Sequence, residues 1–298
     1  MKLASATKLG LSVGYIDCFR KLQVASQKNK VDYVLVGAHA RDVVFAHYLG
    51  ITSQRLTTDI DIRLSVDSWE TFYKFKASLV GLGFEENTKS QHRLSYSTLN
   101  TAHDIGDSLL DIVQLDIVPH GGINTANNEI GWPPDGATVM SVLGFQEAYE
   151  SALTINIEAD LSIRVLSVPG LGLLKLIAWL DRPRDLRQKD ALDLKFSLLN
   201  YDALPNIQEQ TFDQDFAGQY GFEMHKAFAA KFGQDIRKIC SQQSTNYLTE
   251  NIFSDSTETV LERLAFDMNA GGSRDDSQLQ TNFEMLAALR DGFLKGTS

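Results

Sequence analysis

Two aspartates, Asp59 and Asp61, have the residue type and spacing that point most directly to chemistry. Asp59 precedes Ile60-Asp-Ile-Arg-Leu-Ser-Val66, in which apolar and polar residues alternate with the period of a β-strand. Both carboxylates therefore project from one face, where they repel each other unless a positive group lies between them. Carboxylate oxygens suit Mg²⁺ or Mn²⁺. The pair predicts a divalent-cation site, and a solvent-facing strand without metal is the alternative.

A third acid, Asp116, lies in Val113-Gln-Leu-Asp-Ile-Val118, which is typical of another strand. A carboxylate between such apolar neighbours is unfavourable unless charge or hydrogen bonds compensate it. Two interpretations stay open for this residue. It is either a third metal ligand or a buried acid paired with an arginine.

A glycine turn, Gly37-Ala38, follows the β-branched strand predicted over residues 31–36. A helix predicted over residues 39–49 comes next, and the N–H groups of a first helical turn can bind phosphate. Ala38 keeps its backbone N–H, and Arg41 adds a positive charge one helical turn later. Together with the acids, the turn predicts a phosphate site beside a metal site.

Charged residues further along the chain offer more contacts. Lys175 stands in the apolar run Leu-Gly-Leu-Leu-Lys-Leu-Ile-Ala-Trp, so we expect it either to contact a triphosphate or to form an internal salt bridge. In Lys189-Asp190-Ala-Leu-Asp193, the first and last residues share one helix face. This run either contacts the nucleotide or forms a surface ion-pair ladder.

The order of these parts resembles the DNA polymerase β-like nucleotidyltransferase superfamily, and more closely its AbiEii-like toxin branch, known from type IV toxin–antitoxin systems. In that branch a glycine turn precedes Arg-x-Ser/Thr-x-Asp-x-Asp, matched here by Arg55-Leu-Thr-Thr58-Asp59-Ile-Asp61. A helical lysine and an Arg/Lys-Asp-x-x-Asp motif follow, matched by Lys175 and by Lys189-Asp190-Ala-Leu-Asp193. The resemblance covers roughly residues 33–200. It departs at Ala38, where the family often has Ser or Gly.

The resemblance implies in-line displacement with two metal ions, Mg²⁺ or Mn²⁺. Asp59 and Asp61 would hold both cations, and Asp116 would bind the catalytic one and help to deprotonate an acceptor hydroxyl. The acceptor oxygen would attack the α-phosphorus of a nucleoside triphosphate, and pyrophosphate would leave. Nucleotide contacts are implied for a set of residues along the chain: Gly37, Ala38, Arg41, Arg55, Thr58, Lys175, Lys189, Asp190 and Asp193.

The resemblance further implies that the acceptor is RNA, namely the 3′ end of a tRNA, and that a cognate antitoxin is a partner. A protein hydroxyl or a small molecule such as an antibiotic is the alternative acceptor. A non-enzymatic alternative is a nucleotide-binding or antitoxin-like interaction module. Arg55 either neutralises the acid pair when metal is absent or contacts a phosphate.

The elements that must position these residues give an α/β (α+β) class: a nucleotidyltransferase fold with a small mixed sheet, followed by a helical C-terminal domain. We expect the catalytic domain over residues 1–167 and a helical domain that completes the cleft over residues 168–298. Pro119 and the glycines after it are expected to end the strand of Asp116, and residues 119–137 to be irregular. Asp67 followed by Glu70 resembles a capping box, which predicts a helix from there to Gly81 or Gly83. The other expected helices cover residues 12–29, 39–49, 171–182, 187–200, 222–240, 258–269 and 279–294. The expected strands cover residues 31–36, 60–66, 92–98, 109–118 and 161–167.

Composition limits the class of function. The 298 residues are 43% hydrophobic and 22% charged, which is typical of a globular protein with a sizeable core. The net charge of −10 disfavours a general DNA-coating role, because such binding depends on releasing counterions from phosphates. Two cysteines without metal-type spacing indicate a reducing, cytoplasmic compartment. The absence of an apolar run of about eighteen residues predicts no membrane partner.

Overall fold

The computed structural model describes residues 13–51, 59–99, 110–254, 258–269 and 276–296. Contacts divide the chain into two compact units, Met1–Leu166 and Ser167–Ser298. None of the described helices combines the length and the apolar character needed to cross a membrane.

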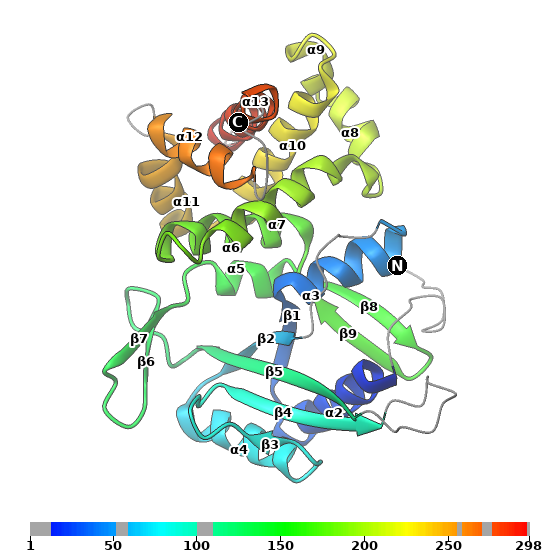
Figure 1. The fold of residues 1–298 in the computed structure, drawn as a ribbon, viewed down its shortest axis with the longest axis vertical. Helices are drawn as coiled ribbons and strands as arrows, with labels where there is room; N and C mark the ends of the chain where they lie inside the picture. Colours follow the sequence, from blue (N-terminus) through cyan, green and yellow to red (C-terminus); the bar gives the residue numbers. More distant parts are fainter. Residues whose placement is uncertain (1–12, 52–58, 100–109, 255–257, 270–275, 297–298) are drawn as a thin grey trace. The chain divides into compact units, whose positions relative to one another are not determined.

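Seven strands form one mixed sheet in the first unit (Figure 1). They are β1 (Asp32–Val36), β2 (Asp59–Val66), β3 (Glu85–Glu86), β4 (Arg93–Leu99), β5 (Leu110–Gly121), β8 (Leu153–Glu158) and β9 (Leu161–Val165). Their order across the sheet is β3-β4-β5-β2-β1-β9-β8. The pairs β2/β5 and β1/β9 are parallel, and the other neighbouring pairs are antiparallel.

One face of this sheet packs against the core. Ile60, Ile62 and Leu64 of β2 are fully buried there, and helices α2 (Val13–Asn29) and α4 (Trp69–Val80) pack against the strands. The helices contribute the fully buried side chains Phe19, Leu22, Phe72 and Phe75. Because side chains alternate along a strand, this burial directs the intervening Asp59, Asp61 and Arg63 to the opposite face.

A short helix, α5 (Phe145–Glu150), covers part of the polar face. The Tyr149 hydroxyl donates a hydrogen bond to Asp32 at the start of β1, with a distance of 3.0 Å. The guanidinium of Arg63 lies 4.4 Å from the ring centre of Phe145. The covered part includes the end of β5, where His120 is fully buried beside Phe145 and Tyr149. Burial lowers the pKa of His120 to about 4, so this residue is neutral at pH 7.

The second unit is helical (Figure 1). Its α-helices are α6 (Val168–Asp181), α7 (Gln188–Leu199), α8 (Ile207–Asp213), α9 (Phe216–Gln219), α10 (Met224–Ile239), α11 (Gln242–Leu248), α12 (Glu258–Asp267) and α13 (Asp276–Lys295). The helices α10 and α13 pack closely. A Cβ atom at Gly292 would collide with the carbonyl oxygen of Ala230, and one at Gly233 with that of Leu289. Glycine therefore permits the two backbones to approach.

The predicted class is confirmed: the fold is mixed α/β, with a mixed sheet and a helical C-terminal region. The expected end of the strand of Asp116 is wrong for Pro119, because β5 continues through this residue, whereas the strand does end at the glycines, with Gly121 as its last residue. Residues 119–137 are not all irregular, since β6 (Glu129–Trp132) forms a hairpin with β7 (Thr138–Ser141). The roles expected for the two domains stay predictions.

The continuation of β5 has a physical reason. Pairing of β4 with β5 ends at Arg93 and Asp116, so beyond that level β5 keeps only β2 as a paired neighbour. Proline is tolerated where its missing N–H faces the unpaired side. The start of α4 also differs from expectation, because Ser68 rather than Asp67 is the N-cap and accepts a hydrogen bond from the Thr71 N–H.

The close approach of α10 and α13 gives a stability prediction. We expect Gly292→Ala to lower the free energy of unfolding by about 2 kcal/mol, because the collision with Ala230 exceeds the gain in helix propensity. Gly81→Ala is the control, since its Cβ would meet its nearest neighbours at 3.5 Å. Urea denaturation measures both variants, and equal effects at the two sites would contradict the close packing.

Candidate active site

The three predicted acids lie on the same polar face of the sheet. Asp61 of β2 and Asp116 of β5 are direct partners in the parallel ladder, and Asp59 pairs with Gln114 two positions earlier. Directly opposed residues point to the same face, and neighbouring strands are about 4.8 Å apart. All three aspartates are partly exposed, so ligands from solvent can reach this face.

The turn at Gly37 lies against Asp61. Val36, the last residue of β1, pairs with Asp61. Gly37 has a φ of +71°, and a Cβ atom there would collide with Oδ2 of Asp61 and lie 3.1 Å from its Cγ. Glycine is therefore required twice, once for the left-handed backbone and once for the contact with the carboxylate.

The helix α3 (Gly37–Asp42) begins at this contact and continues as the π-helical turn η1 (Val43–Tyr48). Its N-cap is Val36, whose side chain has no acceptor to offer the first N–H groups. Ala38 is buried. The helix therefore starts beside Asp61 without a side-chain cap, which is the arrangement expected of a phosphate-binding turn.

Arg93 is the important residue of this face that the sequence interpretation missed. Its Nε and Nη2 atoms donate to Oδ1 and Oδ2 of Asp116 at 2.7 and 2.6 Å, so the guanidinium holds both carboxylate oxygens. The hydrogen bond to Asp116 raises the pKa of Arg93. The pairing with an arginine, left open for Asp116, is thus present in the structure. Arg93 lies within the strand expected over residues 92–98, but the sequence did not show that this strand pairs with the strand of Asp116.

Three further residues of this unit, Arg41, Arg55 and Thr58, were expected to contact the nucleotide. Arg41 is buried, and its guanidinium donates to the carboxylate of the adjacent Asp42 at 2.7 Å. Arg55 and Thr58 lie outside the described residues. A phosphate contact remains a prediction for all three.

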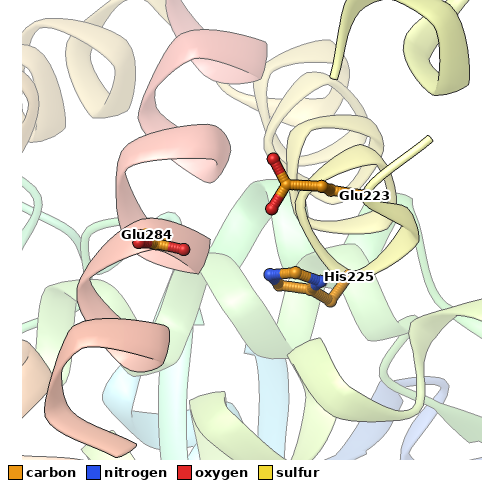
Figure 2. A group of neighbouring side chains, drawn as sticks. All are labelled: Glu223, His225 and Glu284. Atoms are coloured by element: carbon orange, nitrogen blue, oxygen red, sulfur yellow. The ribbon is translucent and has the colours of Figure 1, made fainter. Parts of the chain in front are cut away.

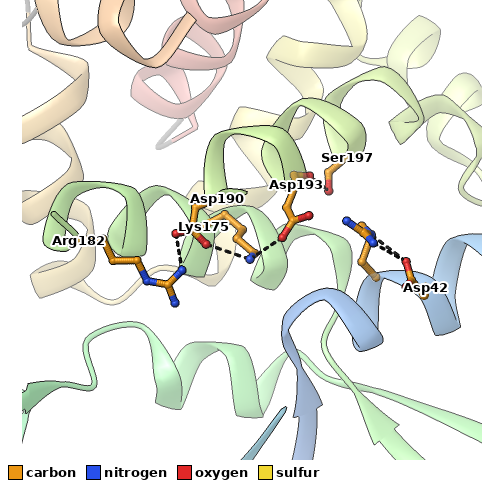
Figure 3. A network of polar contacts seen from close by, with 7 residues as sticks. Asp42, Lys175, Arg182, Asp190, Asp193 and Ser197 are labelled. Atoms are coloured by element: carbon orange, nitrogen blue, oxygen red, sulfur yellow. Dashed lines mark hydrogen bonds and ion pairs between the residues drawn. The ribbon is translucent and has the colours of Figure 1, made fainter. Parts of the chain in front are cut away.

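The second unit holds the predicted lysine and acidic motif in one ion network (Figure 3). The ammonium of Lys175 lies 3.0 Å from Asp190 and 2.6 Å from Asp193. Arg182 binds the second oxygen of Asp190 at 2.6 Å. Both acids are buried, whereas Lys189 is exposed. The internal salt bridge, one of the two alternatives for Lys175, is therefore formed here.

A second carboxylate group also has ligand-like geometry (Figure 2). One ligand atom from each of Glu223, His225 and Glu284 lies within 4.8 Å of the others, which is not so for the three aspartates among the residues that the structure describes. Lys226 already pairs with both acids of this group, since its ammonium lies 2.8 Å from Glu223 and 3.1 Å from Glu284. The chain itself therefore offsets part of the negative charge of the two glutamates.

A cavity of about 660 Å³ lies among helices of the second unit. Arg187 at its wall is bound to Asp267 at 2.7 Å and lies 4.5 Å from the Trp179 ring. The charged side chains that line the cavity are Arg184, Arg187, Arg263, Glu262, Asp267 and Asp276. Their charges balance, so the cavity does not select for an anion such as a triphosphate.

Comparison with known proteins finds distant likeness only. Neither the protein-family models nor the curated protein sequences give a match. The solution structure of the antibiotic-resistance factor ANT(2'')-Ia is similar with a TM-score of 0.33 and 16% identity, over 72% of this chain and all of the other. The CCA-adding enzyme of Thermotoga maritima, solved with tRNA, has a TM-score of 0.27 and 14% identity, over 99% of this chain and 85% of the other.

Both TM-scores are below 0.5 and both identities are below 25%, so neither likeness supports a statement about the function of this chain. The AbiEii-like branch is a prediction from the sequence motifs.

The contact between Gly37 and Asp61 gives a second prediction. We expect Gly37→Ala to lower the free energy of unfolding by about 1–3 kcal/mol more than Gly50→Ala, because both glycines have positive φ but only Gly37 meets another group. Urea denaturation of both variants measures the difference. Combining Gly37→Ala with Asp61→Ala should recover part of the loss, and equal losses at Gly37 and Gly50 would show that the carboxylate contact is unimportant.

The buried ion network gives a third prediction. We expect Lys175→Met to lower the free energy of unfolding by about 3–5 kcal/mol, because Asp190 and Asp193 lose a buried counter-ion. Lys189→Met, at an exposed position of the same motif, should change it by no more than about 0.5 kcal/mol. Thermal and urea unfolding compare the two, and a stable Lys175→Met protein would rule out the network as a structural requirement.

Proposed function

We propose that this protein is a metal-dependent nucleotidyltransferase that transfers a nucleoside monophosphate from a nucleoside triphosphate to an acceptor hydroxyl. The observation that carries the proposal is the row formed by Asp61 and Asp116 on neighbouring strands, with Asp59 on the same face and the Gly37 turn in contact with Asp61. Acids and a phosphate-binding turn are the two parts that phosphoryl chemistry requires in one place.

The residues present fit a divalent cation. Three partly exposed aspartates share one face and offer hard oxygen ligands. Asp59, Asp61 and Asp116 would hold Mg²⁺ or Mn²⁺, which would supply positive charge to the phosphate and lower the pKa of a bound hydroxyl. The Asp61 carboxylate lies against Gly37, so this proposed ligand adjoins the proposed phosphate-binding turn.

The chain's own groups would bind and orient the nucleotide. The backbone N–H groups at Gly37 and Ala38 would donate to phosphate oxygens. Arg41, Arg55 and Thr58 are proposed as further contacts on the same side of the reaction. An acceptor hydroxyl would lose its proton to a carboxylate oxygen of Asp116, once that oxygen is free of Arg93.

The helical unit would contribute the remaining nucleotide contacts. Lys175 is held by Asp190 and Asp193, so these three residues act together, with the acids orienting the ammonium. Lys189 is exposed, and its contact with the nucleotide is proposed from the motif match. The motif would thus have two roles. Its buried acids would position the Lys175 ammonium, and its exposed Lys189 would bind the nucleotide.

The acceptor is proposed to be RNA, as in an AbiEii-like toxin acting on the 3′ end of tRNA and controlled by an antitoxin. The support is the motif order from Gly37 to Asp193. The net charge of −10 favours local contacts at an RNA end over a long basic track. A protein or small-molecule hydroxyl is the alternative acceptor.

One observation favours a second function, that of a nucleotide-binding module without catalysis. Arg93 occupies both oxygens of Asp116, the carboxylate assigned to the acceptor proton. Such a module would bind a nucleoside triphosphate without releasing pyrophosphate. Calorimetry with each triphosphate, followed by a pyrophosphate assay, separates this function from the enzymatic one.

Labelled transfer tests the enzymatic proposal. With each α-³²P-labelled triphosphate, Mg²⁺ or Mn²⁺, and separate RNA, protein and small-molecule fractions, we expect label in the RNA. Asp59→Asn should lower the rate at least about a hundredfold, because a metal ligand and its charge are lost. Asp67→Asn, just beyond the other end of β2, is the matched control and should retain the rate. Label in another fraction would reassign the acceptor, and no transfer at all would remove the enzymatic proposal.

A further inference from the structure

Four residues form a row across the sheet at one level. Arg93 of β4 is the antiparallel partner of Asp116, Asp116 is the parallel partner of Asp61, and Asp61 is the antiparallel partner of Val36. The row therefore has a guanidinium at one flank and the Gly37 turn at the other, with two carboxylates between them. Direct partners in a sheet share a face, so the charged side chains of this row face the same space.

Arg93 and Asp116 form a bidentate ion pair. Both carboxylate oxygens accept from the planar guanidinium, at 2.7 and 2.6 Å, and paired parallel bonds of this type fix orientation as well as charge. The carboxylate of Asp116 is thereby turned toward β4.

We infer that Arg93 is an exchangeable counter-ion of Asp116, which a divalent cation must displace in order to use that carboxylate, and which is then free to bind a phosphate of the nucleotide. The inference rests on the proposed function and adds a residue to it. A cation and a guanidinium cannot share one carboxylate at close range without repelling each other. Loading of the cation and release of Arg93 are therefore a single exchange.

The surroundings permit the exchange without unfolding. The side chain of Arg93 is 33% exposed, whereas that of Asp116 is 14% exposed, so the guanidinium has the freer end of the pair. An arginine released on this face keeps a fork of N–H donors that matches phosphate oxygens. Before the exchange the Arg93 guanidinium pairs with Asp116, and after it the same guanidinium binds a phosphate of the nucleotide.

Mn²⁺ binding in the absence of nucleotide tests the exchange without depending on turnover. Titration of the full chain, followed by electron paramagnetic resonance of free Mn²⁺, should show Arg93→Gln binding at least about threefold more tightly than the wild type. The control is Arg20→Gln, which removes an arginine paired with Glu158 and Asp160 elsewhere in the unit. It should bind Mn²⁺ as the wild type does. Weaker or equal binding by Arg93→Gln would overturn the inference and make Arg93 a support for the metal site or irrelevant to it.

A second measurement uses the unaltered protein, so it holds even where Arg93→Gln fails to fold. The Nε–Hε resonance of Arg93, assigned by its loss in Arg93→Lys, should move to the position of a solvent-exposed arginine when Mg²⁺ is added. A resonance that stays in place at saturating Mg²⁺ would contradict release.

If the wild type transfers label and binds Mn²⁺ through Asp59, but Arg93 is unaffected, only this inference fails. If Asp59→Asn binds Mn²⁺ as the wild type does, the proposed metal site and the inference both fail.

Discussion

Repulsion among carboxylates on one face of the central sheet is the constraint on which the first unit depends. Asp61 and Asp116 are direct partners on neighbouring strands, and such like charges destabilise a sheet. Burial on the opposite face fixes the register of β2. Ile60 and Ile62 are fully buried there, and a shift of one residue would exchange the two faces. Arg93 supplies the charge that the row lacks. An arrangement that opposes local stability in this way is typical of a site kept for its chemistry.

The sequence predicted the parts of the fold that are governed by periodicity. Alternation at residues 60–66 gave the faces of β2, and the apolar spacing of residues 12–29 gave α2, which the structure has over Val13–Asn29. Features that depend on partners were not predictable. The passage of β5 through Pro119 depends on where β4 ends, and the hairpin of β6 and β7 is short and rich in turn residues. Asp67 and Ser68 are both favourable N-cap residues, so the sequence did not show that Ser68 caps α4.

The candidate site was predictable in its acids and its turn, because residue type and spacing place Asp59, Asp61 and Gly37 without knowledge of neighbours. What the sequence could not supply was pairing. Arg93 meets Asp116 only through the register of β4 on β5, and the alternatives for Lys175 differ only in whether Asp190 and Asp193 lie within reach. Local rules therefore gave the candidate ligands, and tertiary structure gave their counter-ions.

The central claim is that the acids of β2 and β5, rather than another carboxylate group, hold the divalent cation. The anomalous scattering of Mn²⁺ in crystals of the full chain, grown with a non-hydrolysable triphosphate, tests it most directly. The account predicts a peak bounded by Asp59, Asp61 and Asp116, with Arg93 turned away from Asp116. A peak at Glu223, His225 and Glu284, with Arg93 still bound to Asp116, would contradict it.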